Sequence, residues 1–241
     1  MQTLTVEGLS KTFKKNTVVN SLNFCLESGQ IVALTGPNGA GKTTTLKCIM
    51  GLLNPTSGVI RVLGESTKSD AAKAQIAYIP EIPELYPMLT VWEHLQFVAL
   101  AYGVSGWETH AEKLIETFDL SPKRDEICSS LSKGMKQKVS ICCALLHNSS
   151  ILLVDEPMIG LDPKAIKDFK TMLMTLRDEG TTILLSTHML DTAENLCDEV
   201  MVMRTGNLIF KGSLEALKQY LHAKESTTLE DLFLEVTENE V

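Results

Sequence analysis

Eight consecutive residues near the start of the chain are of the types that bind phosphate groups. They run Gly36-Pro37-Asn38-Gly39-Ala40-Gly41-Lys42-Thr43 and fit the pattern G-x-x-x-x-G-K-[ST] in full. Glycines let backbone N–H groups turn inward around phosphate oxygens, because no Cβ blocks the approach. The Lys42 ammonium can reach the β- and γ-phosphates and the Thr43 hydroxyl can hold Mg²⁺. These residues and the adjoining Thr44 form a predicted nucleotide site.

The segments on either side of this loop are of the kind that must position it. Ile31–Thr35 is a continuous apolar run, typical of a buried parallel strand, and apolar residues at helical spacing follow the loop. A helix that begins here adds about half a positive charge at its N-terminus. The alternative is a coincidental glycine turn, but a chance match to the pattern is roughly a one-in-a-hundred event. The strand–loop–helix order therefore favours nucleotide binding.

A second apolar run, Ile151–Val154, ends in the carboxylates Asp155 and Glu156. Beside a phosphate loop, Asp155 can orient the ligands of Mg²⁺ and Glu156 can polarise the attacking water as a general base. Such a pair alone is more often a solvated strand end. Following a phosphate loop at this separation, the pair predicts nucleotide hydrolysis.

Length and composition limit the classes of protein that are possible. The chain has 241 residues, a formal net charge of −8 and 44% hydrophobic residues, which suits one large α/β domain or two small ones. The acidic balance argues against nucleic acid as a partner. No run approaches the ~18 apolar residues that cross a bilayer, so we expect any membrane contact to go through a partner. The six cysteines form no C-x-x-C pair, and with no secretory signal they indicate reduced intracellular thiols.

Hydrophobic periodicity predicts the remaining elements. Residues 1 to about 30 alternate like antiparallel strands, and residues 54–80 predict short strands with turns. Residues 90–146 are predicted to be helical, as an inserted subdomain. The apolar runs Ile151–Val154 and Thr182–Leu185 flank a helix-length segment, which is the order of a parallel sheet with crossover helices. A hairpin around Gly206 and an amphipathic helix from Thr228 complete the prediction.

The segment Leu131-Ser132-Lys133-Gly134-Met135-Lys136-Gln137, ahead of Asp155, resembles the signature motif of ATP-binding cassette (ABC) proteins. Other family motifs match in the expected order. They are an adenine-stacking aromatic at Phe13, the Q-loop at Pro80-Glu81, the D-loop at Gly160-Leu161-Asp162-Pro163 and the switch histidine at His188. Tyr78–Glu81, Lys133–Lys138 and Leu229–Phe233 resemble exporter-type cassettes, particularly the bacterial Ecs-type subunits.

This resemblance implies an α/β P-loop NTPase with a RecA-like parallel sheet, an antiparallel β subdomain and an inserted helical subdomain. The implied divisions are a nucleotide-binding core at 1–80 and 148–212, a helical signature subdomain at 81–147 and a helical tail at 213–241. ATP and Mg²⁺ are the implied cofactors. The resemblance also implies a head-to-tail dimer with a second ABC subunit, in which the signature residues Ser132 and Gly134 meet the partner's ATP. Asp162 of the D-loop is a further implied ATP-binding residue.

The resemblance further implies separate transmembrane subunits and a cytoplasmic place on the inner face of the membrane. Lys42, Glu156 and His188 are the implied catalytic residues, and Thr43, Glu81 and Asp155 are the implied Mg²⁺ contacts. The chain departs from the family pattern at Glu81, where glutamine is usual. It also departs at Lys133 and Met135, where glycine and glutamine are commoner.

Several alternatives stay open at this point. Phe13 fits core packing as well as adenine stacking, and the Pro- and aromatic-rich segment Ile82–Tyr102 fits either a helical core or a groove for a membrane subunit. A soluble ABC ATPase, for example of the iron–sulfur assembly type, would share every motif. A kinase of small metabolites would leave the signature and His188 without a role.

Overall fold

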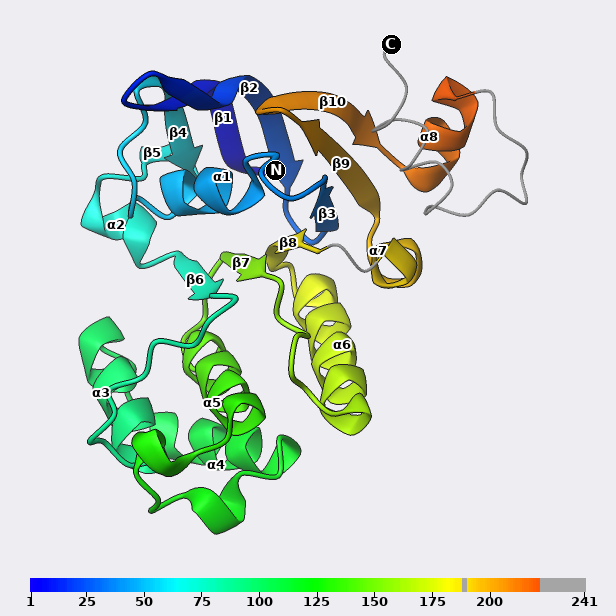
Figure 1. Cartoon of the computed structure of the whole chain (residues 1–241). Helices are drawn as coiled ribbons and strands as arrows, with labels where there is room; N and C mark the ends of the chain where they lie inside the picture. The colour runs from blue at the N-terminus through cyan, green and yellow to red at the C-terminus, as the bar shows by residue number, and fades with distance from the viewer. Residues whose placement is uncertain (188–189, 222–241) are drawn as a thin grey trace.

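The computed structural model describes residues 1–187 and 190–221, which form two sheets and several helices (Figure 1). The strands are β1 (Gln2–Phe13), β2 (Asn16–Glu27), β3 (Ile31–Thr35), β4 (Ser57–Val62), β5 (Glu65–Ser66), β6 (Ile76–Ile79), β7 (Ile151–Asp155), β8 (Thr182–Ser186), β9 (Glu199–Arg204) and β10 (Asn207–Gly212). The helices are α1 (Lys42–Ile49), α2 (Asp70–Lys73), α3 (Val91–Tyr102), α4 (Trp107–Thr117), α5 (Lys133–Leu145), α6 (Pro163–Asp178), α7 (Leu190–Leu196) and α8 (Leu214–Tyr220), with 3₁₀ turns at Ser121–Lys123 and Cys128–Ser130.

The larger sheet has the strand order β10-β9-β3-β8-β7-β6, and only β10 runs antiparallel to its neighbour. Every residue of β3, β7 and β8 is buried, because helices or the second sheet cover both faces. Continuous apolar sequence is what such a position requires. The predicted parallel sheet is confirmed, and it brings the carboxyl ends of β3, β7 and β8 to one edge.

The smaller sheet is antiparallel, with the order β2-β1-β4-β5, and α1 lies between it and the larger sheet (Figure 1). Leu46 and Ile49 of α1 pack with Leu4 of β1 and Leu153 of β7 in one buried cluster. This confirms the predicted antiparallel subdomain and the helix after the glycine loop. The prediction of strands for residues 54–80 missed the short helix α2, whose first turn is capped by the Ser69 side chain.

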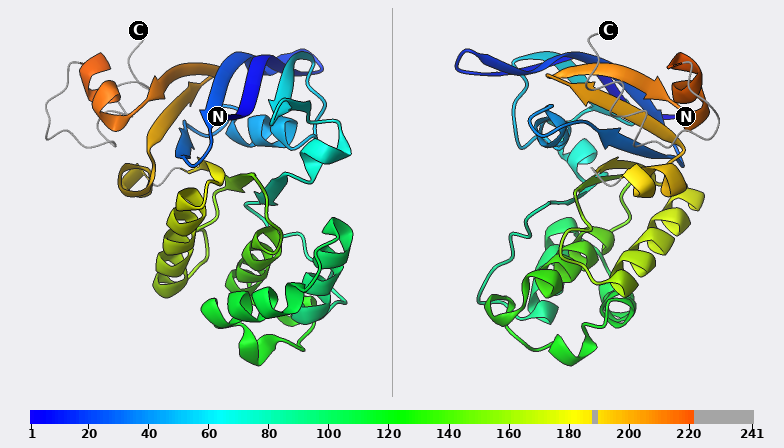
Figure 2. Two further views of the ribbon diagram at one scale, coloured as in Figure 1. Left: turned by 180° about the vertical axis from the view of Figure 1, so that it is seen from behind. Right: turned by 45° about the vertical axis from the view of Figure 1, so that its right-hand side comes forward.

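Helices α3, α4 and α5 form a helical lobe on the side of the larger sheet opposite the smaller sheet (Figure 2). Thr90 and Glu93 form a capping box at the start of α3, and Gly103 ends that helix in the left-handed conformation. Buried residues of all three helices form one hydrophobic core with side chains on the face of the larger sheet that is turned toward them. The helical segment predicted for residues 90–146 is confirmed.

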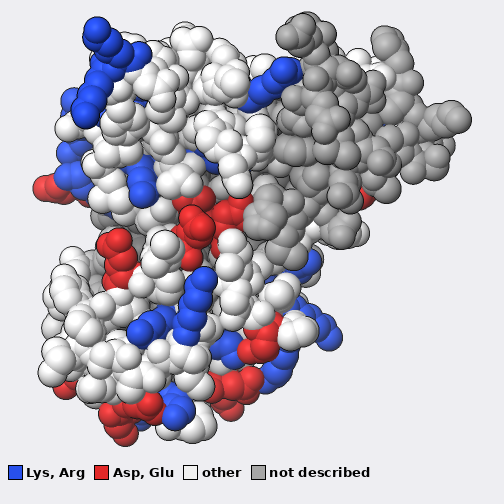
Figure 3. All heavy atoms as spheres, viewed as in Figure 1, with Lys and Arg blue, Asp and Glu red and all other residues white. Residues whose placement is uncertain are grey.

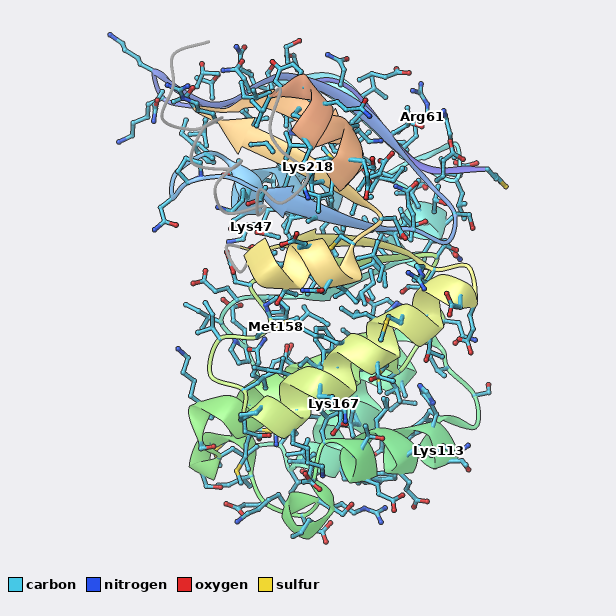
Figure 4. All side chains as sticks on the ribbon, turned by 90° about the vertical axis from the view of Figure 1, so that its right-hand side faces the viewer. Lys47, Arg61, Lys113, Met158, Lys167 and Lys218 are labelled. Atoms are coloured by element: carbon cyan, nitrogen blue, oxygen red, sulfur yellow. The ribbon has the colours of Figure 1, made fainter. Side chains whose placement is uncertain are left out.

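Helix α6 and the hairpin β9–β10 also match their predictions. Met158 lies between α6 and α7, as Figure 4 shows, and it belongs to the same core as the helical lobe. Helix α8 packs on β9 and β10 through Leu217. The helix predicted from Thr228 lies outside the described residues.

Candidate functional site

A pocket of about 470 Å³ lies at the edge of the larger sheet where β3, β7 and β8 end. It is the place where ligands bind in open parallel sheets. The glycine loop and the first turn of α1 form one wall, and two carboxylates form another. The lining residues are Val18, Asn38, Gly39, Ala40, Gly41, Lys42, Thr43, Thr44, Glu81, Glu156, Ile159 and Ser186.

The glycine loop reaches α1 through a conformation that only glycine adopts without strain. Gly41 has φ 104°, and a Cβ there would lie 2.7 Å from the carbonyl oxygen of Val18. The Thr45 N–H donates to the Gly41 carbonyl at 2.9 Å, which closes the first turn of α1. The positive end of the helix and its early N–H groups therefore face the pocket.

Lys42 is buried against the loop that precedes it. Its ammonium donates to the carbonyl oxygens of Gly36 at 2.7 Å and Pro37 at 3.3 Å. Burial lowers the pKa of Lys42, and the carboxylates of Glu156, Asp155 and Glu81 act in the opposite direction. The arrangement holds a cation beside three acidic side chains.

Asp155 ends β7 and is 1% exposed. The Tyr78 hydroxyl donates to its Oδ2 at 3.4 Å, and its Oδ1 is buried with no hydrogen-bond partner among the described residues. The pKa of Tyr78 is raised, first by burial and then by the Asp155 carboxylate. A buried carboxylate oxygen without a protein partner suits a hard cation, because Mg²⁺ prefers oxygen ligands.

The described residues contain no group of three or more His, Cys, Asp or Glu side chains that would hold a metal ion by themselves. Mg²⁺ usually binds through one or two protein oxygens together with phosphates and water. Thr43 lines the pocket, and Asp155 lies beside it at the end of β7. The donor set therefore fits a Mg²⁺ ion that arrives with a nucleotide rather than a resident metal.

Glu156 turns the chain sharply at the end of β7. Its φ is 46°, in the left-handed region that side chains other than glycine rarely adopt, at a cost of about 1–2 kcal/mol. Its N–H donates to the carbonyl oxygen of Ser186 in β8 at 3.0 Å, which fixes the turn. The carboxylate lines the pocket as a result. The residue types predicted Glu156, but this backbone conformation had no signal in the sequence.

Three further predicted residues lie in a second group, outside the residues that line the pocket. Ser132 caps α5 by accepting from the N–H of Met135 at 3.3 Å. Asp162 caps α6 and pairs with Lys138 of α5 at 2.7 Å. That hydrogen bond from Lys138 is the main cause of the lowered pKa of Asp162. Gly134 follows Ser132, so this group lies where α5 and α6 begin.

The remaining predicted site residues are Phe13, Glu81 and His188, of which the structure describes the first two. Phe13 is 43% exposed with the Lys11 ammonium 5.0 Å from its ring centroid, so core packing is wrong for it, while adenine stacking stays a prediction. Glu81 is exposed and lines the pocket. His188 lies outside the described residues. Val18 of β2, Ser186 of β8 and Ile159, which follows Glu156 by three residues, also line the pocket.

Acidic side chains gather between the sheets and the helical lobe on one face of the molecule, with basic side chains just below them (Figure 3). Glu81 and Glu156 are the carboxylates of the pocket itself. A triphosphate would add negative charge here, so its binding needs the Lys42 ammonium, the helix N-terminus and a divalent cation.

A second surface, the apolar groove, lies between the helical lobe and the end of α1. It has a volume of about 430 Å³, and Leu52, Tyr78, Leu85, Val98 and Tyr102 are among its lining residues. Nearby Ile82, Met88 and Leu100 are 66%, 76% and 72% exposed. Within Ile82–Tyr102, Leu95 and Ala99 are buried in the core. The segment is therefore core on one side and exposed apolar surface on the other.

Comparison with known proteins gives consistent results. The family model described as ABC transporter matches residues 19–159. The ABC-type transporter ATP-binding protein EcsA of Bacillus subtilis (strain 168) is 38% identical over 244 residues, covering 100% of this chain and 98% of the relative. The SkfA peptide export ATP-binding protein SkfE of the same organism is 36% identical, covering 87% of this chain and 88% of the relative.

Two solved structures share the fold. An ATP-binding subunit of an ABC transporter has a TM-score of 0.93 and 38% identity, covering 97% of this chain and 99% of the other. A dimeric ATP-binding cassette in a post-hydrolysis state, bound to ADP and Pi, has a TM-score of 0.80 and 25% identity, covering 88% of this chain and 98% of the other. The predicted P-loop NTPase fold is confirmed by these neighbours.

Proposed function

The chain belongs to the ABC transporter family of ATP-binding subunits, which are ATPases, and from that premise we propose that it powers an exporter through separate membrane subunits. The observation that best supports the proposal is that the glycine loop, Lys42 and Glu156 line the same pocket. Export is supported by the similarity to the peptide export subunit SkfE.

ATP binds with its phosphates in the glycine loop. Backbone N–H groups within residues 38–44 and the N-terminus of α1 would face the β- and γ-phosphates, and Lys42 would neutralise part of their charge. Thr43, Asp155 and Glu81 are the residues that would hold Mg²⁺, which when bound neutralises charge on the phosphate oxygens. Phe13 offers its exposed ring to the adenine.

Glu156 acts as the general base. Its left-handed turn and the bond from its N–H to Ser186 hold the carboxylate at the pocket, where it accepts a proton from the attacking water. Such proton transfer contributes about 10²–10⁴-fold to a rate. His188, which follows β8 by two residues, is the proposed contact to the γ-phosphate.

The second group of residues completes the site of another cassette. Ser132, Gly134 and Asp162 lie outside the pocket lining, so they would serve a nucleotide held by the partner in a head-to-tail dimer. The N-terminus of α5 gives them an electropositive end for a γ-phosphate. One chain carries both halves, so a second copy of it suffices as the partner. The dimeric, ADP- and Pi-bound cassette of similar fold supports this arrangement.

The apolar groove is the proposed contact with the membrane subunits. Among the described residues, none of the helices is long and apolar enough to cross a membrane. The groove presents exposed apolar side chains beside the Glu81 loop, so a helix docked there would lie next to the nucleotide pocket. In this scheme residues 81–147 act as the helical signature subdomain between membrane and nucleotide, and the protein sits on the cytoplasmic face.

Substitution of Glu156 by Gln tests the hydrolytic function. We expect turnover to fall by about 10²–10⁴-fold with ATP affinity retained, because the amide keeps the shape but accepts no proton. Glu116→Gln on the exposed face of α4 is the matched control. ATPase rates and fluorescent ATP titrations measure both quantities. Normal turnover in Glu156→Gln would remove Glu156 as the base.

A further inference from the structure

Gln137 lies on α5 and joins two loops that each carry a carboxylate of the pocket. Its side-chain amide Nε2 donates to the carbonyl oxygens of Pro80 and Pro157, both at 3.3 Å. Pro80 directly precedes Glu81, and Pro157 directly follows Glu156. One buried side chain, 1% exposed, therefore binds the backbone next to both acidic residues.

The amide of Gln137 makes the folded chain less stable than an apolar side chain would in one respect. Gln137 Oε1 is buried with no hydrogen-bond partner among the described residues, and such an acceptor costs about 1–3 kcal/mol. An apolar side chain of the same length would fill the space without that cost. Packing alone therefore does not account for glutamine at this position, and its two N–H bonds do.

The acceptors on both loops belong to proline residues. Proline fixes φ near −65° and has no N–H, so it makes the backbone beside each carboxylate stiff. Because the backbone is stiff, a shift of either proline carbonyl also shifts the neighbouring glutamate. Holding the carbonyls of Pro80 and Pro157 on one amide consequently constrains the separation of Glu81 and Glu156.

Two neighbours on α5 fix the same helix face against the segment 157–162. A Cβ on Gly134, three residues before Gln137, would lie 2.6 Å from the carbonyl oxygen of Gly160. Lys138 pairs with Asp162 at 2.7 Å. Residues three and four apart share one helix face, so Gly134, Gln137 and Lys138 contact this segment as a set. The position of α5 is thereby tied to the loop that follows Glu156.

We propose that Gln137 is a positioning residue that sets Glu81 and Glu156 relative to the start of α5. The proposal rests on the function proposed above, since it assumes that these carboxylates act on ATP. The N-cap of α5 is Ser132, which in the proposed function serves the partner's nucleotide. The amide of Gln137 thus links the group offered to the partner with the hydrolytic carboxylates of its own protomer.

The test compares Gln137→Met with the wild-type chain. Methionine keeps the length of the side chain but removes both N–H donors and the unpaired acceptor. We expect kcat to fall about tenfold, because small displacements of catalytic groups cost this much or more. We expect the KM for ATP and the melting temperature to stay near wild type. Gln219→Met on the exposed face of α8 is the control.

Gln137→Asn is the second variant, for use where Met lowers the melting temperature. It keeps the amide but is one methylene shorter, so it cannot reach both carbonyls, and we expect the same loss in kcat. Wild-type kcat in a folded Met or Asn variant would overturn the proposal. Glu156→Gln is assayed in parallel. Normal turnover there defeats the proposed function, whereas loss there together with normal Gln137 variants defeats only the role of Gln137.

Discussion

The nucleotide pocket and the apolar groove lie on either side of the loop that carries Glu81, yet they are built in opposite ways. In the pocket the polar groups are held by the protein itself, as when Lys42 donates to Gly36 and Glu156 is fixed by Ser186. In the groove, large side chains with apolar surface such as Leu52 and Tyr102 are exposed.

The difference indicates what each surface requires to function. A pre-organised polar pocket is completed by a small charged ligand, because its dipoles need no rearrangement. An exposed apolar surface gains stability when a second protein covers it. In the proposed function the pocket hydrolyses ATP and the groove binds the membrane subunits, so substitutions in one should leave the other intact.

The largest effect that separates the two surfaces is expected from Lys42→Ala. Loss of the ammonium removes the charge that stabilises the phosphates, so ATPase activity should fall on the order of 10²–10³-fold. Co-purification with the membrane subunits should not change. A variant that keeps its ATPase rate would show that the glycine loop is not where the phosphates bind.

The converse prediction concerns Leu52→Glu, at an exposed apolar position that lines the groove. A charge placed in an apolar contact should weaken binding to the membrane subunits by about 30-fold, since interface hot spots are worth roughly 2 kcal/mol. The ATPase rate of the isolated chain should stay the same. Val59→Glu, at another exposed apolar position on β4, is the control. Docking at the groove would be contradicted if both variants lost binding to the membrane subunits equally. It would also be contradicted if neither variant lost binding. Full activity without any membrane partner would favour a soluble ABC ATPase.

A smaller effect is expected from Tyr78→Phe, because Tyr78 lines the groove and also donates to Asp155. Losing one hydrogen bond of about 1 kcal/mol should raise the Mg²⁺ concentration needed for half-maximal turnover about fivefold. Tyr220→Phe on α8 should have no effect. An unchanged Mg²⁺ dependence in Tyr78→Phe would contradict the claim that this hydrogen bond holds Asp155 in place as a Mg²⁺ contact.

The smallest effect concerns the pair between Asp162 and Lys138. The pKa of Asp162 is lowered in the folded chain, so its contribution to stability is present above its ordinary value of 3.8 and is lost as pH falls through the folded pKa. Asp162→Asn, which retains the cap of α6, should lower the melting temperature slightly at pH 7 and by less at pH 3. An equal shift at both pH values would attribute it to the cap instead.

The sequence was sufficient for whatever depends on local pattern. The loop at Gly36–Thr43, the buried strand before it and the carboxylates after Val154 are contiguous, so residue type and order predict them. The left-handed turn at Glu156 and the contact between Tyr78 and Asp155 depend on residues from other strands. The short helix α2 depends on a single capping serine, which a strand pattern conceals. Exposure excluded core packing for Phe13 and showed that Ile82–Tyr102 is core on one side and exposed on the other, which periodicity does not reveal.

The central claim is that one ATP is held between two copies of the chain, and the mass of the Glu156→Gln protein in solution tests it most directly. Light scattering on the purified variant with saturating ATP and Mg²⁺ should give twice the 26.5 kDa of one chain, and the mass should return to that of one chain with ADP. Ser132→Arg in the same background should stay at the mass of one chain with ATP, because the bulky side chain blocks the partner's phosphates. The account would be contradicted if Glu156→Gln with ATP bound kept the mass of one chain. It would also be contradicted if the protein were a dimer with or without ATP and with or without Ser132→Arg.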